Sequence, residues 1–366
     1  MKYYCLGAIA LFLLSCSSTS ESPGVPSRKT KVEIRGEQFH INGQPTYRGR
    51  RWNGHLIEGL LFNSRMVQGI FDDQNPRTQD RFKYPDTGVW DTDRNTNEFV
   101  AAMKSWRDHG MLGFTLNLQG GSPMGYGNKD WINTTFDTRG KMKPAFVARL
   151  RKILDQADEL GMVVILGYFY FGQDQYLHGD DAVIAATENA TQWILDQGYT
   201  NVIIEVANEC DNGAYDQAII KRDRVHELIN LVKSIEKDGR RLLVSVSFNG
   251  GRLPSPNVVE VVDYVLLHGN GVKEPSRIME MVQQTKAMEE YTPMPIVFNE
   301  DDHYGYEQDT SNLSAAVMSY ASWGYFDFRR EGEPFEEGYQ SVPVDWAISS
   351  DRKREFFSKI KEITGY

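Results

Sequence analysis

Eight short apolar runs follow one another along the chain, and stretches with helical periodicity separate them. The runs cover residues 66–71, 111–116, 163–168, 202–206, 242–246, 264–267, 296–298 and 324–328. Such strongly apolar strands are typical of a parallel sheet that helices cover on its outside. Eight strands in alternation with helices favour a closed (β/α)8 TIM barrel of the α/β class over an open doubly wound sheet.

The residues at the ends of the helical stretches support this alternation. The stretch 144–160 begins with Pro144 and is followed by Gly161. Proline suits the first turn of a helix, and glycine suits the position just after its end. The other helices are expected at about residues 95–109, 180–197, 215–237, 276–290, 311–322 and 351–364. Ahead of the first run, residues 32–34 and 38–41 alternate and Asn42-Gly43 is a strong turn signal, which predicts a short N-terminal β-hairpin.

The first residues predict an export signal rather than part of the fold. An apolar run at residues 6–14 follows an early lysine and is too short to span a bilayer. Residues 13–16 read Leu-Leu-Ser-Cys and resemble a bacterial lipobox, which implies a lipoprotein signal peptide at 1–15 and lipid attachment to Cys16. An ordinary secretory signal with a chance cysteine is the alternative. Residues 16–30 are rich in Ser, Thr and Pro and are expected to form a flexible tether.

Residues 31–366 are then expected to form a single catalytic domain. Its only expected link to the membrane is the lipid attached to Cys16. We expect the outer membrane as its location, at the periplasmic face or the cell surface. Cys210 is the one cysteine of the folded part, so no intrachain disulfide is expected and the domain must rest on its core.

Charge and motifs exclude several classes of partner. The chain has 366 residues, with 40 Lys+Arg against 50 Asp+Glu, and this net charge of −10 argues against nucleic-acid binding. No Gly-x-Gly-x-x-Gly follows a strand and no P-loop is present, so no nucleotide cofactor is expected. The Gly-x-Ser-x-Gly turn of serine hydrolases is also missing.

Two glutamates stand where two of the predicted strands end. Glu209 follows the fourth apolar run and Glu300 follows the seventh, and Asn208 and Asn299 precede them. The chemistry of a (β/α)8 barrel takes place at the carboxyl ends of its strands. A carboxylate at the rim of an apolar barrel is costly because partial burial disfavours its charge. Each glutamate alone has a simpler reading, as a helix N-terminal acid or a loop acid, but the two together form a candidate catalytic pair.

The arrangement resembles clan A of the glycoside hydrolases, the barrel superfamily that includes the cellulase-like and mannanase-like families. The resemblance implies a retaining glycoside hydrolase that cleaves a β-linked polysaccharide or oligosaccharide. It implies Glu209 as the acid/base, Glu300 as the nucleophile and Asn208 as the ligand of the sugar 2-hydroxyl. Retention requires the two carboxyl groups about 5–5.5 Å apart. The acid role also requires burial and the Glu300 charge to raise the pKa of Glu209.

The chain departs from the clan pattern at two strand ends. After the sixth strand, where a tyrosine usually supports the nucleophile, it offers His268, with Asn270 nearby. His268 is expected to hydrogen-bond Glu300 or the substrate, or to be a structural histidine. At the eighth strand Trp323 stands at the wrong end for sugar stacking, and Asp327 stands at the right end for hydroxyl binding. Further candidates for sugar contacts, each equally able to pack a loop, are Asn117, Gln119, Tyr170, Asn249 and His303.

Two other functions compete with the glycosidase. Asp72-Asp73 and the run Asp301-Asp302-His303 offer ligands for a divalent ion, but no His-x-His pair accompanies them, and no metal is expected. The second alternative is a non-catalytic carbohydrate-binding lipoprotein on a degenerate barrel. That alternative predicts the loss of one carboxylate, and the sequence has both.

Overall fold

The computed structural model describes residues 1, 27–126, 130–308 and 310–366. The predicted signal peptide, the lipidation site Cys16 and most of the tether lie outside the described residues. Among the helices that the structure does describe, none combines the length and the apolar character needed to cross a bilayer.

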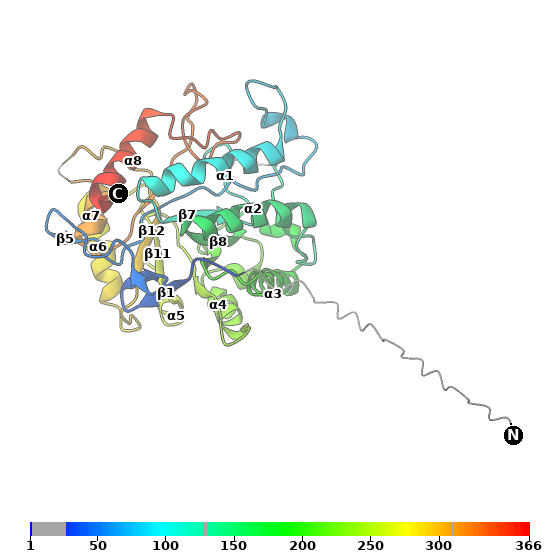
Figure 1. The fold of residues 1–366 in the computed structure, drawn as a ribbon, viewed down its shortest axis with the longest axis horizontal. Helices are drawn as coiled ribbons and strands as arrows, with labels where there is room; N and C mark the ends of the chain where they lie inside the picture. The colour runs from blue at the N-terminus through cyan, green and yellow to red at the C-terminus, as the bar shows by residue number, and fades with distance from the viewer. Residues whose placement is uncertain (2–26, 127–129, 309) are drawn as a thin grey trace.

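In the part of the chain that the structure describes, eight strands form the inner layer and alternate with helices, as predicted. The strands are β6 (Asn63–Ser64), β7 (Gly113–Asn117), β8 (Val163–Tyr170), β9 (Val202–Asn208), β10 (Leu243–Ser245), β11 (Val265–His268), β12 (Ile296–Glu300) and β13 (Gly324–Tyr325). The helices are α1 (Thr92–Asp108), α2 (Pro144–Leu160), α3 (Asp180–Asp196), α4 (Val225–Ser234), α5 (Pro256–Val259), α6 (Pro275–Lys286), α7 (Asn312–Met318) and α8 (Asp351–Thr364). Figure 1 shows the helices around the central strands, with α6, α7 and α8 on one side and α2 and α3 on the other.

Hydrogen bonds place the strands in chain order around the barrel. β7, β8, β9 and β10 form one parallel sheet, β11 pairs with β12, and β13 pairs with β6. Single parallel bridges extend the pairing, between Arg65 and Thr115 on the β6–β7 side and between Asp301 and Tyr325 on the β12–β13 side. At the seam between β10 and β11, a backbone bond from the Asp263 N–H to the Val244 oxygen, 3.0 Å long, spans the gap. All the carboxyl ends therefore meet at one rim.

The prediction of the first barrel strand at residues 66–71 is wrong. The strand is β6, a few residues earlier, and residues 66–71 form turns at the barrel rim. The side chains of Asn63, Ser64 and Arg65 are all buried. A search for apolar runs passes over such a strand. Its polar side chains are buried in the barrel, where Asn63 and Ser64 donate to backbone oxygens and Arg65 pairs with Glu300.

The helix expected at residues 215–237 is shorter than predicted. α4 begins only at Val225, after a short 3-10 helix, η3 (Ala218–Ile220). The buried carboxylate of Asp174 accepts hydrogen bonds from the backbone N–H groups of Asp216 and Gln217, at 2.7 and 2.8 Å. These bonds hold the segment in a loop. The other two short 3-10 helices are η1 (Gln79–Arg81) and η2 (Asp174–Tyr176).

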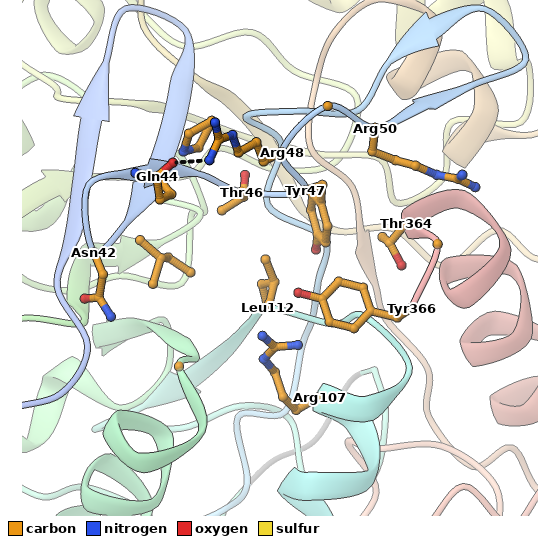
Figure 2. A pocket seen from close by; sticks show the side chains of 15 residues that line it. Asn42, Gln44, Thr46, Tyr47, Arg48, Arg50, Arg107, Leu112, Thr364 and Tyr366 are labelled. Carbon is orange, nitrogen blue, oxygen red and sulfur yellow. Dashed lines mark hydrogen bonds between the residues drawn. The ribbon is translucent and has the colours of Figure 1, made fainter.

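The predicted hairpin lies at the amino-terminal end of the barrel. β1 (Val32–Arg35), β2 (Gln38–Ile41) and β3 (Gln44–Pro45) form an antiparallel sheet, and β4 (Arg51–Trp52) pairs with β5 (His55–Leu56). Asn42 and Gly43 both have positive φ, as their tight turn requires. A cavity of about 690 Å³ lies at this end, and Figure 2 shows Tyr47, Arg107 and Tyr366 around it. This cavity is therefore on the opposite side of the barrel from the carboxyl ends of the strands.

Candidate active site

A second cavity, of about 760 Å³, opens at the carboxyl ends of the strands. Its lining is mostly polar and comes from the carboxyl ends of seven barrel strands, β7 to β13, and the loops that follow them. The lining residues are Ser122, Tyr126, Tyr170, Phe171, Asn208, Glu209, Asp211, Asn212, Gly213, Asn249, Gly250, Arg252, Asn270, Gly271, Glu300, Asp302 and Gln340. Both glutamates of the predicted pair are therefore in this cleft.

Glu209 comes directly after β9 and has a left-handed backbone conformation, with φ of 52°. Such a conformation is unusual for a residue with a side chain and recurs at functional sites. Its N–H donates to Ser247 Oγ at 2.9 Å, which holds the backbone in place. Its carboxylate contacts His268, with Oε1 3.1 Å from Nδ1, and the amide of Asn212 lies 3.4 Å from Oε2.

Glu300 ends β12 and is held on both of its oxygens. Arg65 Nε lies 2.8 Å from Oε2, and both side chains are buried. The amide of Asn270 donates to Oε1 at 2.5 Å. A buried guanidinium on one oxygen and an amide N–H on the other both favour the ionised form of this carboxyl.

The two carboxylates meet across the cleft. Glu209, His268 and Glu300 each present a ligand atom, and these atoms all lie within 4.8 Å of one another. Below them, inside the barrel, is the buried carboxylate of Glu205, which accepts hydrogen bonds from Ser247 Oγ at 2.5 Å and Asn299 Nδ2 at 3.2 Å. His268 Nε2 is 4.0 Å from Glu205, so this histidine stands between three acids.

These contacts shift the pKa values of the pair in opposite directions. Burial raises the pKa of Glu300 above its ordinary value, and the charge of Glu209 adds to this rise while Arg65 opposes it. Burial also acts to raise the pKa of Glu209, but the hydrogen bond and charge of His268 outweigh it and lower that pKa. Burial acts to lower the pKa of His268, yet Glu300 and Glu209 raise it. The direction at Glu209 is the reverse of the one that sequence analysis required.

The structure brings three of the predicted sugar-contact residues into the cleft. Asn208 lies beside Glu209, and its Oδ1 is buried with no hydrogen-bond partner in the described part of the chain. Tyr170 lines the wall and shares a hydrogen bond with Ser122 Oγ, 2.9 Å from its hydroxyl. Asn249 also lines the cleft and donates through Nδ2 to Asp211 at 2.8 Å.

Other predicted contact residues do not line the cleft. Asn117 is buried in the barrel against Gly167, where a Cβ on that glycine would come within 2.2 Å of the Asn117 Oδ1. Gln119 Nε2 donates to Thr134 Oγ1 at 2.9 Å and thereby ties a loop to the barrel. A sugar contact at Asn117 or Gln119 therefore stays a prediction, since neither side chain lines the cleft.

The two candidates near the seventh and eighth strands are also occupied by structural contacts. His303 Nδ1 lies 2.9 Å from Asp301 Oδ1, outside the cleft lining. Asp327 is fully buried and accepts hydrogen bonds from the hydroxyls of Tyr304 and Tyr325, both at 2.8 Å. Trp323 is buried too and donates Nε1–H to Asp301 Oδ2 at 3.0 Å, so it offers no stacking surface.

Sequence reasoning missed the residues that support the two glutamates. Arg65 had no signal of its own, because it sits in the strand that was misplaced. Glu205 offered one, since it is a lone charge within the apolar run of β9. Tyr126 and Arg252 come from loops of irregular structure and reach the cleft only through the fold.

The candidate metal ligands lie close together but are already engaged. Asp301, Asp302 and His303 present ligand atoms within 4.8 Å of one another. Asp301 Oδ1 also accepts from the Asn312 amide at 3.2 Å, and its Oδ2 accepts from Trp323. Both carboxylate oxygens of Asp301 therefore already accept hydrogen bonds from neighbouring side chains.

Comparison with known proteins finds likeness in structure and not in sequence. No family model matches the sequence, and no curated protein sequence matches it. A glycoside hydrolase family 5 protein from Bacteroides vulgatus has a TM-score of 0.55 at 14% identity, over 89% of this chain and 69% of that chain. A beta-glucanase from Saccharophagus degradans, in complex with cellotetraose, has a TM-score of 0.54 at 11% identity, over 92% and 95%.

A third similar structure is a glycoside hydrolase family 5 mannosidase from Rhizomucor miehei, with a TM-score of 0.51 at 13% identity, over 93% of this chain and 99% of that one. Structural neighbours of this chain are thus family 5 enzymes, which belong to clan A. The likeness shows that the chain has the (β/α)8-barrel fold, which confirms the predicted fold class. At these identities it does not assign the chemistry of the site.

Proposed function

We propose that this chain is a retaining glycoside hydrolase that acts on a β-linked glycan. The observation that carries the proposal is the approach of Glu209 and Glu300, whose nearest ligand oxygens lie within 4.8 Å across an open cleft. Retaining glycosidases need this short separation because one carboxylate attacks the sugar directly. The structural neighbours that act on glucans and mannans support the same class of substrate.

The reaction would be a double displacement. A Glu300 oxygen attacks the anomeric carbon, the bond from this carbon to the leaving oxygen breaks with its electron pair on that oxygen, and Glu209 gives the oxygen its proton. Water then attacks the same carbon, passes a proton to Glu209 and releases the Glu300 carboxylate. The net change is the addition of one water across the glycosidic bond.

The contacts of each glutamate support its role. Arg65 and Asn270 stabilise the ionised Glu300 that must attack, and they stabilise it again when it leaves the sugar. His268 Nδ1, 3.1 Å from Glu209 Oε1, stabilises the carboxylate that Glu209 becomes after it has given up its proton. Because His268 lowers the pKa of Glu209, we expect Glu209 to hold its proton best at acidic pH.

We also propose that the enzyme works outside the cytoplasm, tethered by lipid on Cys16 at the outer membrane. The lipobox-like residues 13–16 support this location. A polysaccharide too large to enter the cell is a substrate that suits it.

A substrate screen with two variants tests the proposal. Activated aryl β-glycosides and β-1,4-linked glucan and mannan oligosaccharides are incubated with the protein, and the products are separated. Glu300→Gln should abolish turnover, whereas Glu209→Ala should spare activated aryl glycosides more than natural glycans, because a good leaving group needs no acid. The exposed Glu188→Gln on α3 is the control and should behave as wild type. Glycan binding without turnover would favour the carbohydrate-binding alternative instead.

A further inference from the structure

Asn270, two residues after His268 at the end of β11, makes a direct contact with Glu300. Its Nδ2 donates to Glu300 Oε1 at 2.5 Å and lies 2.9 Å from the hydroxyl of Tyr126. The Asn270 Oδ1 is buried and has no partner among the described residues. The orientation of the amide is thus fixed by its two contacts through nitrogen.

The backbone around Asn270 is fixed to the strand that carries Glu300. The N–H of Gly269 donates to the backbone oxygen of Glu300 at 2.7 Å. A Cβ on Gly269 would come within 2.2 Å of Asp301 Oδ2, so only glycine allows this close approach. The amide nitrogen of Asn270 is therefore presented to Glu300 by a rigid segment, as a positioning role requires.

Tyr126 holds the other side of the Asn270 amide. Its hydroxyl accepts from Asn270 Nδ2 and donates to Asp302 Oδ2 at 3.3 Å. Its ring packs edge-on against Phe326 and Phe328, with centroids 5.7 and 5.0 Å apart. The side chain is still 54% exposed and lines the cleft. Tyr126, from a loop after β7, therefore holds the Asn270 amide that contacts Glu300 from the end of β11.

We propose that Asn270, held in place by Tyr126, is a positioning residue for the nucleophile Glu300. The inference rests on the proposed function. It predicts that the amide N–H favours the ionised Glu300 and that the Tyr126 hydroxyl supports Glu300 by holding the Asn270 amide.

The charged and titratable groups that face Glu300 come from several elements and must be considered together. They are Arg65 beside β6, Tyr126 after β7, Tyr170 on β8, Glu209 after β9 and His268 on β11. Arg65, His268 and the Asn270 hydrogen bond lower the pKa of Glu300, whereas burial and Glu209 raise it. Loss of the Asn270 amide should therefore raise this pKa, so that Glu300 becomes ionised only at higher pH.

The test compares pH profiles of kcat and kcat/KM on an activated aryl β-glycoside. Asn270→Ala should lower kcat roughly 10- to 100-fold, the value of a hydrogen bond to a charged group, and move the acidic limb to higher pH. Asn270→Asp has the same size but places a carboxylate against Glu300, so it should move the limb further. Tyr126→Phe should shift it in the same direction by less. KM should change much less than kcat in all three variants.

Two controls separate positioning from packing. Asn257→Ala on α5 and Tyr176→Phe on η2 alter the same residue types outside the cleft and should leave the profile unchanged. If Asn270→Ala fails to fold, Tyr126→Phe in the exposed loop carries the same prediction.

The outcomes distinguish this inference from the proposed function. An unshifted acidic limb in Asn270→Ala and Asn270→Asp, with Glu300→Gln inactive, would overturn the inference alone. Wild-type rates in Glu300→Gln, or no turnover by the wild-type protein, would overturn both.

Discussion

Arg65 and Glu300 form an ion pair inside the mouth of the barrel, with side chains only 1% and 6% exposed and 2.8 Å between Nε and Oε2. The carboxylates of Glu205 and Glu209 also act on Arg65 and, with Glu300, raise its pKa although burial works against this. A single buried cation thus balances several buried acids. Its loss should affect both stability and catalysis.

We expect Arg65→Met to lower kcat/KM by roughly 10²- to 10³-fold, as when one charge-stabilising group is removed from an active site. Since Arg65 lowers the pKa of Glu300, its removal should move the acidic limb of the pH profile to higher pH. The buried carboxylate left without its partner should also cost about 3–5 kcal/mol of unfolding free energy. Steady-state kinetics and urea unfolding measure these effects.

Two further variants show whether the effect of Arg65→Met comes from the loss of its charge at this site. Arg65→Lys keeps the charge and should recover part of the activity. Arg48→Met removes an arginine from the cavity at the opposite end of the barrel, where it donates to the Gln44 side chain, and should change neither measurement (Figure 2). Full activity in Arg65→Met would show that Glu300 needs no fixed cation.

His268→Gln should move the alkaline limb of the pH profile to higher pH. The alkaline limb reports the loss of the proton from Glu209, if Glu209 is the acid. His268 lowers the pKa of Glu209, so its removal raises this pKa and keeps the acid protonated at higher pH. The measurement is kcat/KM on a natural glycan across pH. The exposed His109→Gln is the control, and a shift to lower pH in His268→Gln would contradict the acid role of Glu209.

The sequence allowed prediction of the fold where strands are apolar and helix ends are marked. β9 and β12 were found because both are mostly apolar runs, broken in β9 only by Glu205, and each leads to a glutamate at its carboxyl end. β6 was missed because its side chains are polar and buried. In a sequence, polar residues are taken as exposed, because the groups that bind them inside the fold are not visible there. The barrel then supplies those partners from strands far away in the sequence.

The support of the site was harder to predict than the pair itself. The contacts from Arg65 and Tyr126 depend on where a misplaced strand and an irregular loop lie in space. Asn117 and Asp327 stand at strand ends as a sugar ligand would, but in the barrel their side chains pack inward or bind tyrosine hydroxyls. Position along a strand therefore identifies candidates, and only the fold separates ligands from loop anchors.

Cys16→Ser should abolish lipid attachment and leave catalysis unchanged. Cys16 is the residue that the lipobox-like motif identifies for acylation, and the proposed chemistry does not involve it. Metabolic labelling with a fatty acid and mass spectrometry of the mature N-terminus measure attachment, and aryl glycoside turnover measures catalysis. Cys210→Ser, at a buried free thiol, is the control and should remain labelled. Lipid on Cys16→Ser would place the anchor elsewhere.

At the seam between β10 and β11, Asp263 makes hydrogen bonds through both its side chain and its backbone. Its Oδ2 accepts from the Val244 N–H at 2.9 Å, and its carboxylate binds Arg241 through two hydrogen bonds of 2.7 Å. The Asp263 N–H also donates to the Val244 oxygen at 3.0 Å. Where a ladder is missing, these bonds satisfy backbone groups that would otherwise face the barrel wall unpaired.

Asp263→Ala should therefore destabilise the fold by about 2–4 kcal/mol, because it leaves the Val244 N–H and a partly buried guanidinium without their acceptor. Asp263→Asn retains one acceptor and should lose less. Urea unfolding followed by tryptophan fluorescence gives the comparison. Asp108→Ala breaks an exposed ion pair with Lys104 and should leave the midpoint unchanged, since solvent screens such pairs. Equal midpoints for Asp263→Ala and wild type would mean that the neighbouring ladders hold β10 and β11 together without this side chain.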